Sequence, residues 1–159
     1  MKKKIIAVVL LLCVALLTLT ACFGSEKKFT VAGMTITLNN QFTEKDVMGQ
    51  TKSYQSLRVA VTVLKEEFTL TAGMEDMTLK QYTQAVIKAN KLSATVNEGE
   101  KYDYFTYEKT ANAQNYYYYA TTFKASDAFW LIQFGCLTSD KDKYQPKFEK
   151  WADTVVFED

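Results

Sequence analysis

Apolar and polar residues alternate most regularly between positions 56 and 64, where the sequence reads SLRVAVTVL. The apolar residues that recur at every second position are Leu57, Val59, Val61 and Val63. This period is typical of a β-strand that buries one face. Residues 29–38 (FTVAGMTITL) predict two shorter strands that meet at Gly33, because glycine permits a tight turn or a bulge. Residues 39–54 are mostly polar and predict a loop.

The period changes to that of a helix in residues 77–92 (MTLKQYTQAVIKANKL). The apolar stripe at spacings of three and four consists of Leu79, Tyr82, Val86 and Ala89. Thr78 and Gln81 have the spacing of a capping box, which predicts that the helix begins after Thr78. Residues 93–100 predict a short strand followed by a turn at Gly99.

Three strands are expected in close succession, over residues 101–109, 116–124 and 128–137. The connections of residues 110–115 and 125–127 are short, so both predict β-hairpins. The third segment, AFWLIQFGCL, is apolar on both faces. A strand of that kind is expected at the centre of a sheet, with cover on each side.

A second helix is expected over residues 144–157, with Pro146 in its first turn, where the missing N–H is harmless. Its apolar face consists of Tyr144, Phe148 and Trp151. The predicted fold class is therefore α+β, an antiparallel sheet of about six to seven strands with helices packed on it.

The order of these elements resembles the PsbP-like fold, which is also found in DcrB-like bacterial lipoproteins. The resemblance runs from Phe29 to Phe157 and depends on three stretches: TLKQYTQAVI, the aromatic hairpins between Tyr102 and Phe134, and FEKWADTVVF. It implies an α/β/α sandwich. It also implies a binding or assembly module and not an enzyme, although fold alone does not determine function.

The amino terminus carries a different pattern. Three lysines, Lys2 to Lys4, precede an apolar run that starts at Ile5, which is the layout of a secretory signal. The run ends in Leu19-Thr20-Ala21-Cys22, which resembles the lipobox of bacterial lipoproteins. The resemblance implies that Cys22 receives a diacylglyceryl group and that a signal peptidase cuts between Ala21 and Cys22. The alternative is an uncut transmembrane anchor, because the run is just long enough to span a bilayer.

Cleavage would divide the chain into a signal peptide (residues 1–21), a tether (22–28) and a single domain (29–159). The 138 residues after the cut carry 16 lysines and arginines against 18 acidic residues, a net charge of −2. No basic cluster remains, which argues against nucleic acid as a partner. Cys136 is then the one cysteine without a lipid, so no disulfide is expected within the domain.

The residues that usually perform catalysis are missing. The chain contains no histidine, no glycine-rich phosphate loop and no paired-cysteine motif. Its acidic groups lack the spacing of a calcium loop and are interpreted as solvated turns and a helix terminus. Cys136, among large apolar neighbours, is expected to be a buried thiol with a raised pKa. We therefore predict no enzyme activity, no cofactor and no metal site.

Tyrosine is the most distinctive residue type, because seven of its ten copies lie between Tyr102 and Tyr119. Alternation places Tyr102 and Tyr104 on one face with Tyr107 on the other, and Tyr116 and Tyr118 opposite Tyr117 and Tyr119. Most of these rings are expected to stabilise the sheet through cross-strand pairs. The candidate binding residues are Tyr102, Tyr104, Tyr116 and Tyr118, because tyrosine combines flat apolar area with a polar tip.

The sequence predicts a lipoprotein held at the extracytoplasmic face of the cell membrane through Cys22. Its domain is expected to bind a partner, such as a membrane or envelope protein, or to assist envelope assembly. One alternative is a lipoprotein that binds a small molecule or glycan on its tyrosine-rich sheet face. The third hypothesis is an enzyme that uses carboxylates or tyrosine, such as a cell-envelope hydrolase.

Overall fold

The structure is a computed structural model that describes residues 24–158. The predicted signal peptide, the cleavage site and Cys22 lie outside these residues. The elements follow in this order: β1 (Glu26–Val31), β2 (Met34–Asn39), β3 (Thr43–Lys45), β4 (Lys52–Gln55), β5 (Val59–Glu67), η1 (Phe68–Leu70), α2 (Leu79–Ala89), β6 (Asp103–Ala111), β7 (Gln114–Lys124), β8 (Ala128–Leu137), η2 (Thr138–Asp140), α3 (Lys141–Asp153) and β9 (Val156–Phe157).

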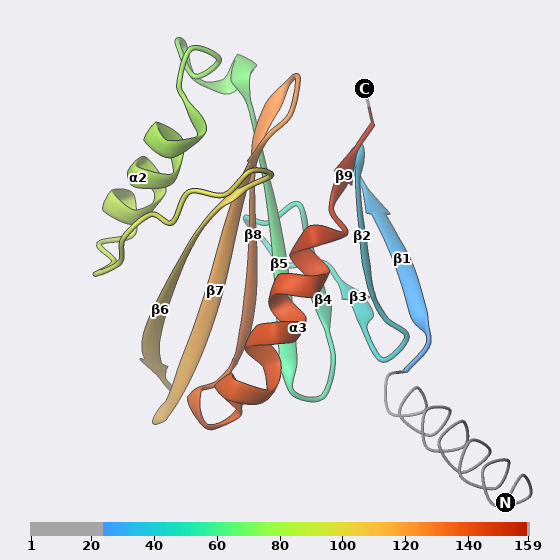
Figure 1. The fold of residues 1–159 in the computed structure, drawn as a ribbon. Coiled ribbons are helices and arrows are strands. Elements are labelled where there is room, and N and C mark those ends of the chain that lie inside the picture. Colours follow the sequence, from blue (N-terminus) through green and yellow to red (C-terminus); the bar gives the residue numbers. More distant parts are fainter. Residues whose placement is uncertain (1–23, 159) are drawn as a thin grey trace, which may run out of the picture.

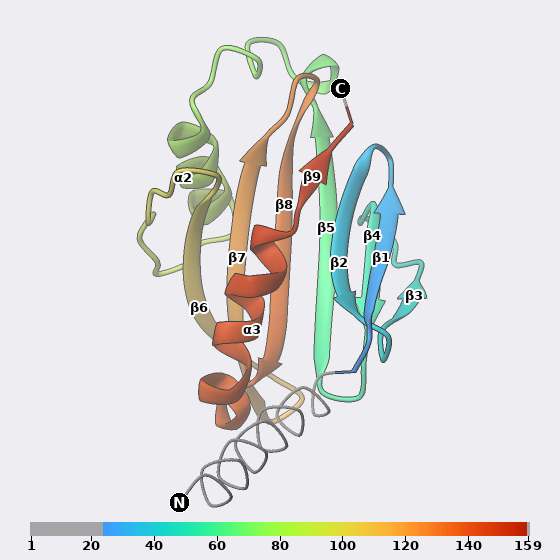
Figure 2. The same ribbon diagram turned by 45° about the vertical axis from the view of Figure 1, so that its right-hand side comes forward.

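Two antiparallel sheets and two α-helices make up the described fold, which confirms the predicted α+β class. The larger sheet has six strands in the order β3-β4-β5-β8-β7-β6, and the smaller has three in the order β1-β2-β9. β8 lies between β5 and β7, which confirms its predicted central position. Figures 1 and 2 show α2 on one face of the large sheet, with α3 and the small sheet on the other. The layers therefore form the α/β/α sandwich that the resemblance implied.

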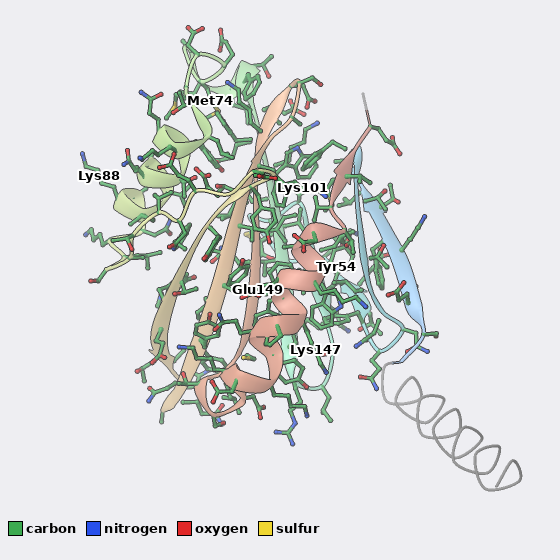
Figure 3. The ribbon with its side chains drawn as sticks, in the orientation of Figure 1. Tyr54, Met74, Lys88, Lys101, Lys147 and Glu149 are labelled. Atoms are coloured by element: carbon green, nitrogen blue, oxygen red, sulfur yellow. The ribbon has the colours of Figure 1, made fainter. Side chains whose placement is uncertain are left out.

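The main core lies between the large sheet and α3. Phe148 of α3 is fully buried, and its ring stacks on that of Phe134 in β8 at 5.4 Å. The small sheet closes the same core, since the ring of Phe29 lies 4.8 Å from that of Tyr54. Figure 3 labels Tyr54 in this position between the sheets. The predicted apolar face of the last helix is confirmed at Phe148 and Trp151.

The other face of the large sheet is only partly covered, by α2. The predicted capping box is present, because the Thr78 side chain accepts from the Gln81 N–H while the Gln81 side chain accepts from the Thr78 N–H. Tyr82 stacks on Phe129 at 4.3 Å and donates a hydrogen bond to Glu66. The predicted stripe is wrong at its end: Ala89 is exposed.

The loop expected over residues 39–54 is interrupted by β3 and by the first three residues of β4, so the expectation was wrong for these two segments. Polar strands form here because β4 pairs with β5, from Lys52 opposite Val63 to Gln55 opposite Ala60. Tertiary pairing of this kind overrides a polar composition. The strand expected within residues 93–100 is reduced to one bridge, between Asn97 and Tyr104.

The last helix is displaced from its predicted position. It begins at Lys141 and ends at Asp153, and Pro146 therefore lies in its second turn, not its first. The proline leaves the carbonyl of Asp142 without its usual helical donor, which is tolerable close to the helix start. Val156 and Phe157 form β9, which pairs with Thr35 and Met34 of β2. These two residues leave the predicted helix because the edge of β2 supplies partners.

The predicted tether of residues 22–28 overlaps β1. Glu26, Lys27 and Lys28 are paired with residues of β2 in that strand. Among the described residues of the predicted tether, Gly24 and Ser25 precede the sheet.

Candidate functional site

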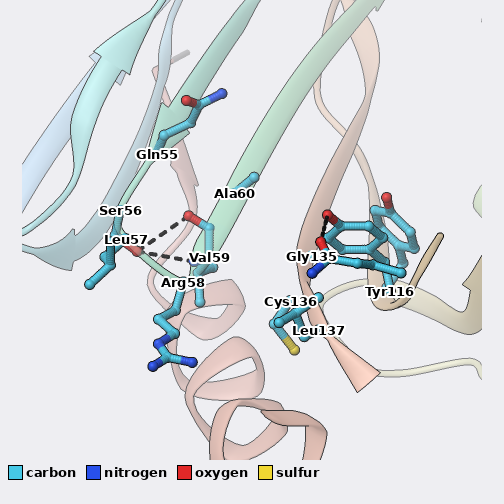
Figure 4. Close-up of a pocket in the computed structure, with 12 residues that line it drawn as sticks. Gln55, Ser56, Leu57, Arg58, Val59, Ala60, Tyr116, Gly135, Cys136 and Leu137 are labelled. Carbon is cyan, nitrogen blue, oxygen red and sulfur yellow. Dashed lines mark hydrogen bonds between the residues drawn. The ribbon is translucent and has the colours of Figure 1, made fainter. Parts of the chain in front are cut away.

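The part of the large sheet that α2 leaves uncovered contains a hollow of about 520 Å³ (Figure 4). The β4–β5 connection forms one side of it, β8 forms the floor, and the start of β7 forms the other side. The lining side chains that matter for the argument are Leu57, Arg58, Ala60, Tyr116, Tyr118 and Leu137. Its size is within the range of about 300–1,000 Å³ that small-molecule sites occupy.

The floor of the hollow depends on a glycine in the central strand. Gly135 of β8 pairs with Ala60 of β5 on one side and with Tyr118 of β7 on the other. The ring of Tyr118 lies directly over Gly135, and a Cβ atom at position 135 would stand 2.9 Å from Tyr118 Cε1. A glycine in a strand often marks such a close approach. Gly135 therefore allows the tyrosine ring to lie flat on the sheet and to shape the hollow.

A row of tyrosines forms the aromatic wall. Tyr118 stacks on Tyr107 with ring centroids 4.8 Å apart and planes 11° from parallel, and Tyr116 follows at 6.5 Å. The Tyr107 hydroxyl donates to Gln133 Oε1 at 2.6 Å, and the Tyr116 hydroxyl donates to Gln114 Oε1 at 2.9 Å. Burial raises the pKa of Tyr107 to about 12 and also raises the pKa of Tyr118. The hydroxyls of Tyr107 and Tyr118 are thus neutral at ordinary pH, so these two rings offer apolar area and hydrogen-bonding tips without charge.

The rim of the hollow is the short β4–β5 connection. Its backbone is held at both ends, because the Ser56 N–H donates to the carbonyl of Val59 (2.9 Å) and the Val59 N–H donates to Ser56 Oγ (3.2 Å). The closed turn leaves Leu57 at its tip, 96% exposed. Beside it, Arg58 Nη1 lies 3.5 Å from Asp140 Oδ2. The rim therefore presents one large apolar side chain next to one guanidinium.

The structure divides the four predicted binding tyrosines between two faces. Tyr116 and Tyr118 line the hollow, as described above. Tyr102 and Tyr104 point toward α3: Tyr102 donates to Asp153 Oδ1 at 3.2 Å, and Tyr104 stacks on Tyr119 at 5.1 Å. The predicted alternation of faces is confirmed, but the four residues do not form one surface.

Several residues of the hollow were not predicted as site residues. Gly135 lies in an apolar strand and is paired with Tyr118 of the neighbouring strand. A glycine opposite a tyrosine could have indicated this position in the sequence. Leu57 was assigned to the buried face of β5, whereas the strand begins two residues later at Val59. Arg58 and Ala60 gave no signal, because their role depends on which part of the sheet α2 leaves open.

Cys136 is buried on the α3 face, and burial raises its pKa to about 11, which confirms the expected buried thiol. Within residues 24–158, no group of three or more histidine, cysteine or acidic side chains could hold a metal ion. Neither helix of this part of the chain is long and apolar enough to cross a membrane.

Comparison with known proteins shows the fold class. No protein-family profile and no curated protein matches the sequence. The structure of cyanobacterial PsbP (CyanoP) from Synechocystis sp. PCC 6803 is similar, with a TM-score of 0.59 at 14% identity over 85% of this chain and 94% of that one. A protein from Bacteroides thetaiotaomicron is similar with a TM-score of 0.56 at 12% identity, over 86% of this chain and 49% of that one. The domain therefore has a PsbP-like fold, as the sequence predicted.

Proposed function

We propose that this chain is a membrane-anchored lipoprotein whose PsbP-like domain binds a partner without catalysing a reaction. The observation that carries the proposal is the hollow over β8, where an apolar floor meets a wall of tyrosine rings. Aromatic residues around an open depression are typical of recognition surfaces, because each ring buries a large apolar area while its hydroxyl keeps a hydrogen bond. The lipobox-like sequence ending in Cys22 supports the anchor and the extracytoplasmic location.

The composition of the hollow favours binding over hydrolysis. Among the described residues that line it there is no carboxylate, and its one charged side chain is Arg58. A glycosidase of the usual kind needs two carboxyl groups that face each other across the substrate. The hydrolase hypothesis therefore has no support at this site.

Site-directed photo-crosslinking in intact cells tests the proposal. A photoreactive amino acid at position 116 lies in the wall of the hollow, and the same amino acid at position 70 lies at an exposed site in η1. We expect one dominant crosslinked protein from position 116 that is missing from position 70. Identical products from the two positions, or none from position 116, would contradict a recognition site in the hollow.

The anchor has a separate test. The mature protein should carry a diacylglyceryl-modified Cys22 as its first residue, which mass spectrometry of the amino-terminal peptide detects. Cys22→Ser should abolish both the modification and the cut. A wild-type chain that keeps an unmodified Cys22 would disprove lipidation while leaving the binding site in the hollow untouched.

A second candidate, a small molecule or glycan in the hollow, is favoured by its volume of about 520 Å³. Native mass spectrometry of protein purified from its source would show a bound molecule as an added mass. We expect Tyr116→Ala and Tyr118→Ala to reduce that added species, whereas Tyr104→Ala, on the opposite face of the sheet, should leave it unchanged.

A further inference from the structure

The first described residues lie at one end of the large sheet. β1 begins at Glu26, and the carbonyl of Ser25 accepts a hydrogen bond from the Asn40 N–H at 2.8 Å. The chain is thus held by the fold from Ser25 onward. Cys22 precedes that point by three positions, which span at most roughly 10 Å when fully extended. An anchor at Cys22 keeps this end of the domain against the bilayer.

The rim of the hollow lies at the same end. Figures 1 and 2 both show the β4–β5 connection at the same end of the molecule as the start of β1, while η1 and the carboxyl terminus lie at the opposite end. Leu57, at the tip of this connection, is 96% exposed, and the bonds between Ser56 and Val59 hold the turn that presents it. The anchored end therefore carries a large apolar side chain on a fixed loop.

The charges of the two ends differ in sign. At the anchored end, residues 56–58 and 138–144 carry Arg58, Lys141 and Lys143 against Asp140 and Asp142. At the opposite end, where Figure 3 labels Met74, residues 68–78 and 125–127 carry Glu75, Asp76 and Asp127. Two lysines lie beside them, because Lys65 Nζ is 2.7 Å from Asp127 Oδ2 and Lys124 Nζ donates to the carbonyl of Glu75, so the three acids keep an excess of one negative charge over these two lysines. Anionic lipid attracts lysine and arginine close to the surface and repels carboxylates. This difference in charge between the two ends favours the orientation in which the anchored end faces the bilayer.

We infer that the β4–β5 connection is a second membrane contact, with Leu57 inserted into the interfacial region of the bilayer. The occupant of this surface is the phospholipid bilayer itself. Leu57 enters the acyl boundary while the Arg58 guanidinium and the lysines at the start of α3 stay level with the phosphates, as basic side chains do at membrane interfaces. Because Leu57 and Arg58 also line the hollow, its ligand is bound at the membrane surface.

This inference rests on the membrane anchor of the proposed function but not on its chemistry. If the apolar run from Ile5 to Ala21 stayed uncut, it would anchor the chain at the same point of the sequence. The hypothesis of lipidation and the hypothesis of this orientation can therefore be disproved independently. The first is read from the mass of the amino-terminal peptide and the second from the depth of Leu57.

Brominated-lipid quenching of tryptophan emission tests the orientation. Full-length Leu57→Trp and Leu70→Trp chains are purified from membranes and reconstituted into vesicles of phosphatidylcholine and phosphatidylglycerol, with or without bromine on the acyl chains. Leu70 is the matched control, because it is an exposed leucine (72%) at the opposite end. The wild-type chain supplies the emission of Trp130 and Trp151, which are buried.

We expect bromine to remove roughly half or more of the emission added at position 57, since interfacial apolar groups lie about 5–10 Å deep. The emission added at position 70 should not change. Equal quenching at both positions, or none at position 57, overturns the inference. Iodide dissolved in the buffer quenches the emission of residues exposed to water. If neither brominated lipid nor iodide quenches the emission added at position 57, a second copy or a protein partner covers the loop, and the inference is overturned as well. A chain that stays out of the vesicles overturns both the inference and the anchor.

Discussion

The contact between Gly135 and Tyr118 leads to a prediction in which the effect of one substitution changes sign. Alanine is normally favoured over glycine inside a strand, by about 0.5–1 kcal/mol, because glycine loses more backbone entropy on folding. At position 135 a Cβ atom would stand 2.9 Å from the Tyr118 ring, where ordinary contacts begin at 3.4 Å. The ring would have to withdraw by about 0.5 Å. Its withdrawal is opposed because Tyr118 stacks on Tyr107, which the hydrogen bond to Gln133 holds in place.

Overpacking of this kind typically costs about 1–3 kcal/mol. We therefore expect Gly135→Ala to lower the free energy of unfolding by roughly 0.5–2 kcal/mol after the gain in strand propensity is subtracted. In a Tyr118→Ala background the ring is gone, and the same Gly135→Ala change should raise the free energy of unfolding by about 0.5–1 kcal/mol. The coupling energy of the two positions should be about 1–3 kcal/mol, within the range known for residues in contact.

Urea unfolding of the four proteins of this cycle, followed by tryptophan emission, measures these quantities. Trp130 and Trp151 are buried on the α3 side of the sheet and report loss of the core without touching the substituted site. Equal slopes of the unfolding free energy against urea would show that the variants unfold from similar native states. A Gly135→Ala change that destabilises both backgrounds equally would refute the proposed role of the glycine.

Three further predictions concern the fold. Burial raises the pKa of Asp103, whose Oδ2 has no hydrogen-bond partner among the described residues. The contribution of the protonated Asp103 carboxyl to the free energy of unfolding is therefore present at acid pH, and it is lost as the pH rises through this raised pKa. Asp103→Asn should therefore gain stability relative to wild type between pH 3 and 7 in urea titrations, and a constant difference would contradict this. Phe148→Ala should cost about 3–5 kcal/mol in the same assay, since it empties a fully buried aromatic site, and Tyr144→Ala on the same helix face should cost clearly less. Ala113→Gly should raise the melting temperature, because Asn112 and Ala113 both have positive φ (50° and 60°) and Asn-Gly suits such a hairpin turn better; an unchanged or lower melting temperature would show that the turn is not strained.

Local patterns predicted most of the elements of the fold. The capping box at Thr78, the alternation through β5 and the short hairpins around β7 depend on neighbouring residues, so they can be recognised without knowledge of the rest of the molecule. β3, β4 and β9 could not be recognised in this way. Each is four residues or fewer, and each forms because an adjacent strand offers partners.

The tyrosine cluster shows the same division for the candidate site. Sequence alternation correctly assigned which rings share a face, because the side chains of a strand alternate strictly. It could not say which face stays open. That depended on the length and placement of α2, which covers Phe105 and Phe129 but leaves Gly135 and Tyr118 uncovered.

The sequence by itself determined the fold class, the central position of β8 and the absence of histidine chemistry, since each follows from residue types and their local spacing. It also carries the lipobox-like segment at Cys22, from which the membrane location is proposed. Only the tertiary structure decided that Tyr116 and Tyr118 meet Leu57 and Gly135 around one hollow, because these residues come from two strands and one turn that are distant in sequence. It also decided that the hollow lies at the end where the chain enters the fold, and this position connects the candidate binding site to the proposed anchor.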